Sequence, residues 1–179
     1  MDLTDPGLPA ARHLVGPDAR DLVDAALTHL GGTLHALTSV QVQHRPGREL
    51  VVRYDAEVAW PGRTAPSAET LVAAATAGGA PAGTLRLVAG ELEVGLWRYP
   101  FDPRLPALAD AVTPRAGEDL RVVAFRPTRR AVVRAVAPSG AVTYRKVVRP
   151  ERAARLVAAH ERLVAAGLPV PAVVEADVD

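Results

Sequence analysis

The chain contains no cysteine among its 179 residues. This absence excludes disulfides, thiolate catalysis and zinc sites with cysteine ligands. No apolar run approaches the roughly 18 residues that a membrane-spanning helix needs, and the acidic, proline-broken N-terminus does not read as a signal peptide. The sequence therefore predicts a cytoplasmic protein without a membrane partner.

Lysine is almost as scarce, since Lys146 is the single lysine among 21 basic residues. The richness in alanine, arginine, proline and valine indicates a genome that replaces lysine by arginine wherever either residue serves. A lysine that persists then marks a position where arginine does not serve, or it is a surface residue that survived by chance.

Acidic residues are scarce in one part of the chain. Residues 1–120 hold 10 arginines and 15 acidic residues, a net charge of −5, whereas residues 121–179 hold 11 basic and 5 acidic residues, a net charge of +6. Within 121–155, Glu151 is the single acidic residue against 10 basic ones. Such a cluster favours an anionic partner such as phosphate, or it is an arginine-rich surface that faces solvent.

Several functional signatures are missing. The five histidines have no metal-ligand spacing, and neither a P-loop nor a GxSxG sequence is present. No pairing of aromatic with basic residues matches an RNA-binding motif, which argues against nucleic acid as a partner. The sequence thus predicts no metal site.

The first part of the chain has the pattern of one helix followed by antiparallel strands. Residues 1–16 are expected to be irregular and disordered. A helix is predicted from Pro17 to Leu30, and Arg45–Arg48 has the composition of a turn between two strands. Predicted strands cover 34–42, 50–58, 69–75, 84–89 and 91–99, and a short helix covers 102–112. Residues 114–119 are the best linker candidate.

The second part has a clearer pattern. Strands are predicted over Leu120–Arg126, Arg130–Ala137 and Ala141–Arg149, a helix from Pro150 to about Ala166, and a short strand over Ala172–Glu175. The fold class is therefore α+β, with two small antiparallel-sheet-plus-helix units, one over 1–116 and one over 117–179. The stretches 45–53 and 126–134 also match each other, which indicates either two related units or two hairpins with the same turn chemistry.

The order of three strands, a helix and a strand resembles the N-lobe of protein-kinase-like enzymes. More closely, the stretches 126–134 and 144–153 resemble actinobacterial members of the aminoglycoside phosphotransferase-like family. The maltokinases of that family also carry an N-terminal cap domain, a role that residues 17–113 would fill. The resemblance implies an ATP-dependent kinase that uses Mg²⁺ and transfers phosphate to a hydroxyl group of a small molecule.

The resemblance also implies roles for individual residues. Lys146, midway along the third strand, would bind the α- and β-phosphates of ATP, and Glu161 on the following helix would be its ion-pair partner. Glu151 is a rival partner, but its place at the helix start is better explained by the helix dipole. Glu161 could also be a surface carboxylate. Arg129 and Arg130 lie at the phosphate-covering loop, which here lacks glycine and could be a plain hairpin turn.

The family's catalytic aspartate and metal ligands follow the region that this chain covers. The chain is therefore expected to be an N-terminal fragment that is inactive alone and that dimerises through apolar surface left exposed on its last helix and strand. The alternative is a stand-alone α+β module that binds an acidic ligand or a protein. A kinase lobe predicts a Lys146–Glu161 ion pair, whereas the alternative predicts that both side chains are solvated and unpaired.

Overall fold

The computed structural model describes residues 3–90 and 92–177. It divides the chain into two compact units, Met1–Pro103 and Arg104–Asp179. Each unit is built on an antiparallel sheet with helices beside it, so the predicted α+β class with two sheet-plus-helix units is confirmed. The division lies ahead of residues 114–119, where the sequence suggested a linker, and that stretch belongs to the second unit.

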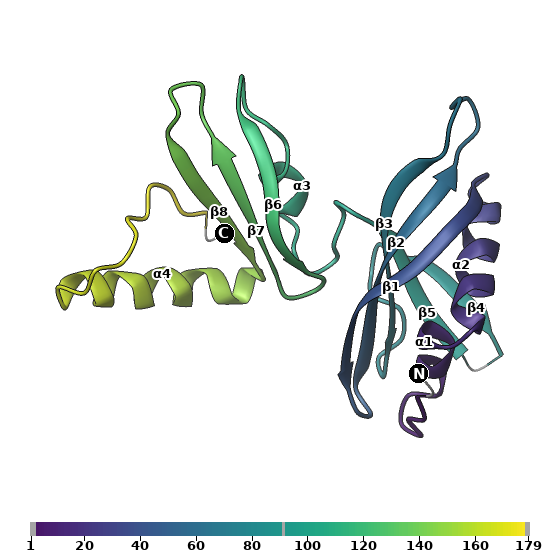
Figure 1. The fold of residues 1–179 in the computed structure, drawn as a ribbon. Helices are drawn as coiled ribbons and strands as arrows, with labels where there is room; N and C mark the ends of the chain where they lie inside the picture. Colours follow the sequence, from purple (N-terminus) through teal and green to yellow (C-terminus); the bar gives the residue numbers. More distant parts are fainter. Residues whose placement is uncertain (1–2, 91, 178–179) are drawn as a thin grey trace. The chain divides into compact units, whose positions relative to one another are not determined.

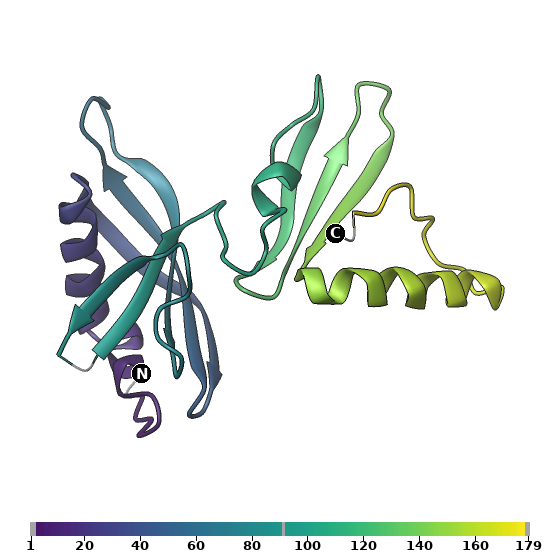
Figure 2. The same ribbon diagram turned by 180° about the vertical axis from the view of Figure 1, so that it is seen from behind.

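The first unit contains a five-stranded sheet whose strand order is β1-β2-β3-β5-β4, with every pair antiparallel. Its helices precede the sheet in the chain, and the long helix α2 runs along one face of it (Figures 1 and 2). The elements are η1 (Pro9–Ala11), α1 (Arg12–Val15), α2 (Asp18–His29), β1 (Thr33–Arg45), β2 (Glu49–Ala59), β3 (Ser67–Thr76), β4 (Leu85–Ala89) and β5 (Leu92–Arg98). The ambiguous segment 69–75 is thus a strand, as predicted.

The structure of residues 8–15 shows that one prediction was wrong. They were expected to be disordered, but they form η1 and α1, and Leu8, Ala10, Ala11 and Leu14 are buried in the core. Helix geometry places these small and apolar side chains against the sheet, and the burial compensates for the ordering of the chain. The sequence pattern was too short and too interrupted by proline and glycine to reveal this.

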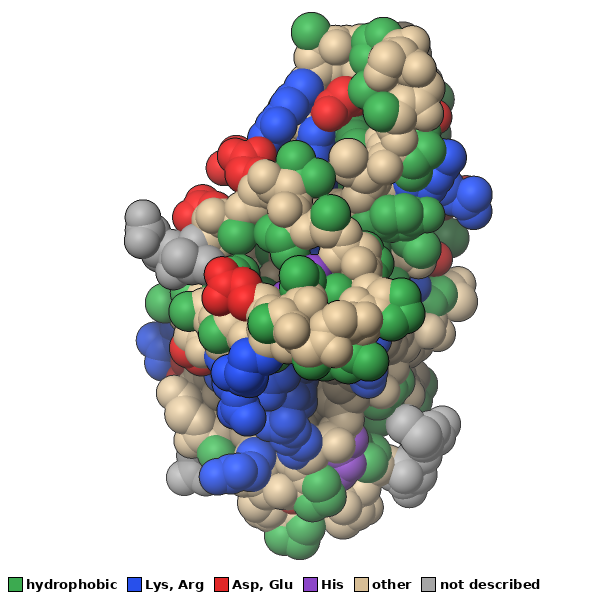
Figure 3. All heavy atoms as spheres, turned by 90° about the vertical axis from the view of Figure 1, so that its left-hand side faces the viewer, with side chains coloured by type: hydrophobic (Ala, Val, Ile, Leu, Met, Phe, Trp, Pro, Cys, Tyr) green, Lys and Arg blue, Asp and Glu red, His purple; other side chains and the backbone are tan. Residues whose placement is uncertain are grey.

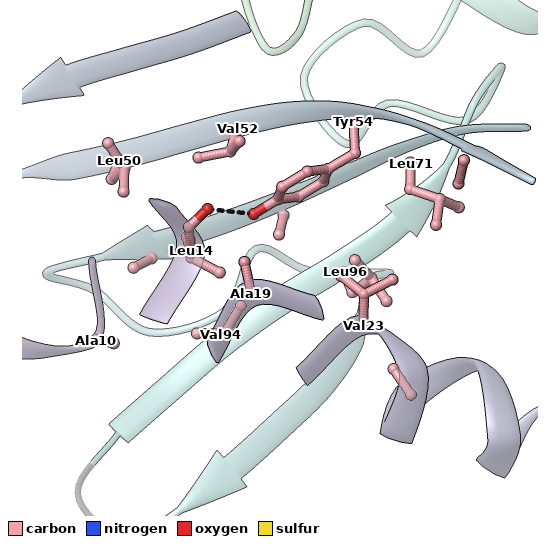
Figure 4. Packing of buried hydrophobic residues seen from close by; sticks show 14 of the residues in the cluster. Ala10, Leu14, Ala19, Val23, Leu50, Val52, Tyr54, Leu71, Val94 and Leu96 are labelled. Atoms are coloured by element: carbon pink, nitrogen blue, oxygen red, sulfur yellow. Dashed lines mark hydrogen bonds between the residues drawn. The ribbon is translucent and has the colours of Figure 1, made fainter. Parts of the chain in front are cut away.

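A buried hydrogen bond joins the N-terminal helices to the sheet. The hydroxyl of Tyr54 on β2 donates to the backbone oxygen of Leu14 at 2.5 Å, in the middle of the apolar cluster (Figure 4). Burial raises the pKa of the Tyr54 phenol well above its usual value, so the group stays a neutral donor. The Leu14 carbonyl lies near the end of a single-turn helix, where backbone oxygens lack intrahelical partners.

The second unit contains a three-stranded sheet of order β6-β7-β8. Its elements are α3 (Leu108–Ala111), β6 (Asp119–Arg126), β7 (Arg130–Val136), β8 (Val142–Val148) and α4 (Pro150–Ala165). The three strands and α4 agree with the sequence pattern to within one or two residues. The predicted helix over 102–112 is reduced to α3, and the predicted strand over Ala172–Glu175 is wrong, because residues 168–177 form no regular element.

The two matching stretches form the same turn. Arg48 donates its backbone N–H to Arg45 at 3.0 Å, and Arg129 donates to Arg126 at the same distance. Both turns place proline second, and their third residues, Gly47 and Thr128, have φ of +65° and +59°, as a type II turn requires. The first strands of the two hairpins differ in where their register shifts, so the match reflects shared turn chemistry and does not establish a duplication.

Replacing Tyr54 by phenylalanine should destabilise the first unit by about 1–3 kcal/mol, because it leaves the buried Leu14 carbonyl without its donor. Urea unfolding followed by tryptophan fluorescence measures the change, since both tryptophans lie in this unit. Tyr99→Phe is the comparison, as Tyr99 lies outside the helix–sheet contact. Equal stability of Tyr54→Phe and the wild-type chain would contradict the assigned role.

Replacing Gly47 by threonine should cost about 1–2 kcal/mol of unfolding free energy, because a branched side chain is strained at positive φ. A Cβ atom at Gly47 would have no neighbour within 4 Å, so the cost comes from the backbone alone. Gly47→Asn is the matched control, since asparagine tolerates this conformation. If urea unfolding gives threonine and asparagine the same stability, positive φ does not determine the cost.

Candidate anion-binding face

Strand pairing separates the side chains of the second sheet into two faces. Residues that lie directly opposite in a pair of strands point to the same side. One side carries a buried apolar set, the inner face: Phe125, Ala131, Val133, Ala135 and Val147. Leu105 and Leu108, in the segment that precedes the sheet, are also buried, and α3 contacts β8. The inner face is therefore the core side of this unit.

The opposite side carries five basic residues, here called the cationic face: Arg121, Arg126, Arg130, Arg134 and Lys146. Arg126 lies opposite Arg130, Arg121 lies opposite Arg134, and Lys146 lies opposite Val132 on β7. All five are exposed except Arg134, which is half-buried. Like charges directly opposite each other destabilise a sheet, so this arrangement costs stability unless an anion offsets it.

Within the described residues, none of the five has an ion-pair partner. The single acidic residue in strands β6 to β8 is Asp119, at the first position of β6 and opposite Val136. The cationic face therefore keeps a local excess of positive charge. Figure 3, which views the side of Figure 1 where α4 ends, also has a group of Lys and Arg side chains with few acidic ones among them.

Lys146 and Glu161 are not brought together. Both side chains are exposed, and no ion pair joins them in the described part of the chain. No residue of α4 is fully buried, although Ala153 and residues 157–160 are half-buried. The described residues thus do not form the ion pair that the kinase resemblance implies. Glu151, the rival partner, lies 3.8 Å from Arg149 instead.

Arg149, the residue just before α4, holds the turn between β6 and β7 in place. The Nε atom of Arg149 donates to the backbone oxygen of Thr128 at 2.6 Å, and Pro127 and Thr128 are buried. Arg129 is half-buried and has a partner of its own, whereas Arg130 is exposed on the cationic face. Of the two arginines predicted at this loop, the geometry thus leaves Arg130 open to a ligand.

Sequence reasoning missed Arg145, which the pleat directs to the inner face. One of its terminal nitrogens donates to the backbone oxygens of Ala111 and Thr113 at 3.1 and 3.3 Å, and the other pairs with Glu118. Both charged side chains are largely buried, with 18% and 15% of their surfaces exposed. Arg145 therefore binds residues 111–118 to β8. An arginine beside the single lysine gave no signal of this, because both looked like members of one basic cluster.

Tyr144 is a second residue that the pattern did not single out. It lies on β8 opposite Arg134, two residues from Lys146, and 62% of its surface is exposed. Alternation along the strand puts Tyr144 and Lys146 on the same face. The cationic face thus combines positive charge with one exposed aromatic ring.

Comparisons with known proteins supply no relative. No protein-family model, curated protein or solved structure matches the chain. None of the helices in residues 3–90 and 92–177 has both the length and the apolar character that crossing a membrane would take.

The Glu118 carboxylate gives the second unit a pH dependence. A hydrogen bond from the backbone N–H of Arg115, and then the Arg145 guanidinium, hold the pKa of Glu118 below its ordinary value of 4.5. The folded state thus favours the ionised form, so its contribution is complete above pH 4.5 and is lost as the pH falls through the lowered pKa.

Glu118→Gln should therefore flatten the acid limb of stability below about pH 4.5, because the charge that Arg145 binds is gone at every pH. Amide hydrogen exchange along β8 between about pH 3 and 7 would follow this unit separately. Glu161→Gln serves as the control, since Glu161 is exposed on α4 and makes no ion pair in the described part of the chain. An unchanged acid limb in Glu118→Gln would refute the assignment.

Proposed function

We propose that the cationic face binds the phosphates of a nucleoside triphosphate, ATP with Mg²⁺, and that the chain supplies nucleotide contacts of a small-molecule phosphotransferase. The observation that carries the proposal is the exposed, unpaired lysine on a strand whose neighbour presents two arginines beside it. The acceptor would be a hydroxyl group of a small molecule, as the family resemblance implies.

The spacing of the cations suits a polyphosphate. Arg130 and Arg134 lie two residues to either side of Val132, the residue opposite Lys146. Diagonal neighbours in an antiparallel pair are about 7–8 Å apart at their Cα atoms, and their long side chains can converge on one group. Three converging cations would attract the negatively charged phosphates of a triphosphate, and no acidic residue at the centre of the face opposes this attraction.

Lysine and arginine would contact the phosphates in different ways. The Lys146 ammonium is a compact point charge that can sit between two phosphates, whereas each guanidinium offers a planar fork to one phosphate. Val132, half-buried beside Lys146, and the exposed Tyr144 ring give the face an apolar surface suited to a base or a ribose. These residues fit ATP as a ligand.

The cationic face would contact Mg²⁺ only through the phosphates that it holds. In the described residues no three His, Asp or Glu side chains gather as a metal site would need. Mg²⁺ is usually held by one or two carboxylates together with substrate phosphates and water. The residues of this chain would therefore hold the phosphates of Mg-ATP and contribute no set of ligands to the metal.

A second candidate function is an interaction module for an acidic or protein partner. It is favoured by the absence of the Lys146–Glu161 pair and by α4, which carries exposed Leu156, Leu163 and Val164 and buries none of its residues. Apolar surface of this kind on an unpacked helix is typical of a docking site. The role of the first unit, as a cap domain or otherwise, would differ between the two functions.

The single lysine allows a direct test. Mg-ATP should slow the modification of Lys146 by an amine-reactive reagent, because bound phosphate shields the ammonium group. Mass spectrometry measures the rate, and the N-terminal amine of the same chain is the internal control, since its rate should not change. Lys146→Ala should lose Mg-ATP affinity, whereas Arg63→Ala, which removes an exposed arginine of the first unit, should keep it.

Equal labelling rates with and without Mg-ATP, together with equal affinities of the two variants, would refute nucleotide binding at this face. Binding of inorganic tripolyphosphate as tightly as ATP would retain the phosphate contacts but remove the case for a nucleotide. Either result would favour the interaction module.

A further inference from the structure

Strand β8 is a free edge of the second sheet. It pairs with β7 on one side, and in the described chain no strand pairs with its other side. Two apolar side chains of this edge are exposed, Val142 at 45% and Tyr144 at 62%. An open edge with exposed apolar residues is a template for another strand, and natural proteins usually cover or charge such edges.

The segment 171–177 has the character of the missing strand. Its pattern predicted a strand over Ala172–Glu175, yet the segment forms no regular element. Val173 and Val174 are 50% and 85% exposed. Glu175 in this segment lies beside Arg115, and no ladder joins the segment to β8. A strand-forming segment and a strand edge are therefore both left unpaired.

Charge favours the tail segment over a second β8 as the strand that pairs with the β8 edge. Two copies of β8 paired with each other would bring Arg145 and Lys146 close to the same residues of the partner, which like-charge repulsion opposes. The tail segment instead carries Val173, Val174 and Glu175, so it is apolar and acidic. Glu175 pairs with Arg115 at 3.7 Å, but both side chains are highly exposed, so this pair is easily exchanged.

We propose that residues 172–175 of one copy add as a strand to the β8 edge of a second copy, and that the exchange is reciprocal. Alternation would put Val173 and Glu175 on the cationic face, where Val173 meets Tyr144 and Glu175 meets Lys146. A two-fold dimer closes the β8 edges of both copies at once, so these edges recruit no further copy. The proposal does not rest on nucleotide binding, with which the added strand would compete for Lys146 and Tyr144, and it gives the exposed apolar residues of this unit a partner.

Because the chain has no cysteine, engineered thiols can test the contact. Val173→Cys protein is mixed with Tyr144→Cys protein under mild oxidation, and a mixed disulfide dimer should accumulate. Val88→Cys replaces Val173→Cys in the control, since Val88 is 57% exposed on the edge strand β4 of the first unit. The control pair should cross-link much more slowly.

Sedimentation equilibrium of the 179-residue chain gives the second readout. The wild type should dimerise, and Val174→Pro should weaken the dimer about tenfold or more, because proline removes a ladder donor and disfavours strand pairing. Val174→Thr keeps strand propensity and should dimerise as the wild type does. Val174 is so exposed that neither change should affect folding.

Three results would overturn the proposal. The first is a wild-type chain that stays monomeric at high micromolar concentration. The second is a dimer that Val174→Pro leaves intact. The third is a Val173→Cys, Tyr144→Cys double variant that forms its disulfide within one chain and remains a monomer, which would mean that the tail pairs with its own β8.

Discussion

The second unit depends on one guanidinium. Arg145 holds the backbone oxygens of Ala111 and Thr113 and the carboxylate of Glu118, and so binds the whole segment before β6 to the inner face of β8. A largely buried arginine is tolerated only when its charge and donors are satisfied, and this segment satisfies them. Because the inner face is covered in this way, the other face of the sheet is left to solvent.

The cationic face is the consequence. The pleat that turns Arg145 inward turns Lys146 outward, and strand register then collects four arginines on the same side. The helix α4 has half-buried residues but none that is fully buried, and the cationic residues stay largely exposed. The unit therefore presents charge, one aromatic ring and an open edge together, which are features that favour a ligand or a second chain over an isolated monomer.

Much of the fold could be predicted because it depends on local signals. Turns at Pro46-Gly47 and Pro127-Thr128, the alternation in β2 and β7, and proline at the start of α4 each determine their own element. The prediction for residues 8–15 was wrong because their helices gain stability from burial against the sheet, with contacts to β3 and β5, and not from their own propensity. The prediction for residues 172–175 was wrong for the opposite reason, since the segment has the propensity for a strand but pairs with no strand of the described chain.

Some features of the candidate site were likewise predictable from the sequence, and others were not. The sequence by itself determined that positive charge gathers between 121 and 155, that Lys146 is the only lysine, and that this lysine lies on an antiparallel strand, because composition and alternation are properties of the chain alone. Only the tertiary structure decided that Arg145 is a buried anchor, that Arg130 and Arg134 flank Lys146, and that Glu161 does not reach it. Those relations depend on strand register and on helix packing, which bring distant residues together and are not encoded in any short stretch of sequence.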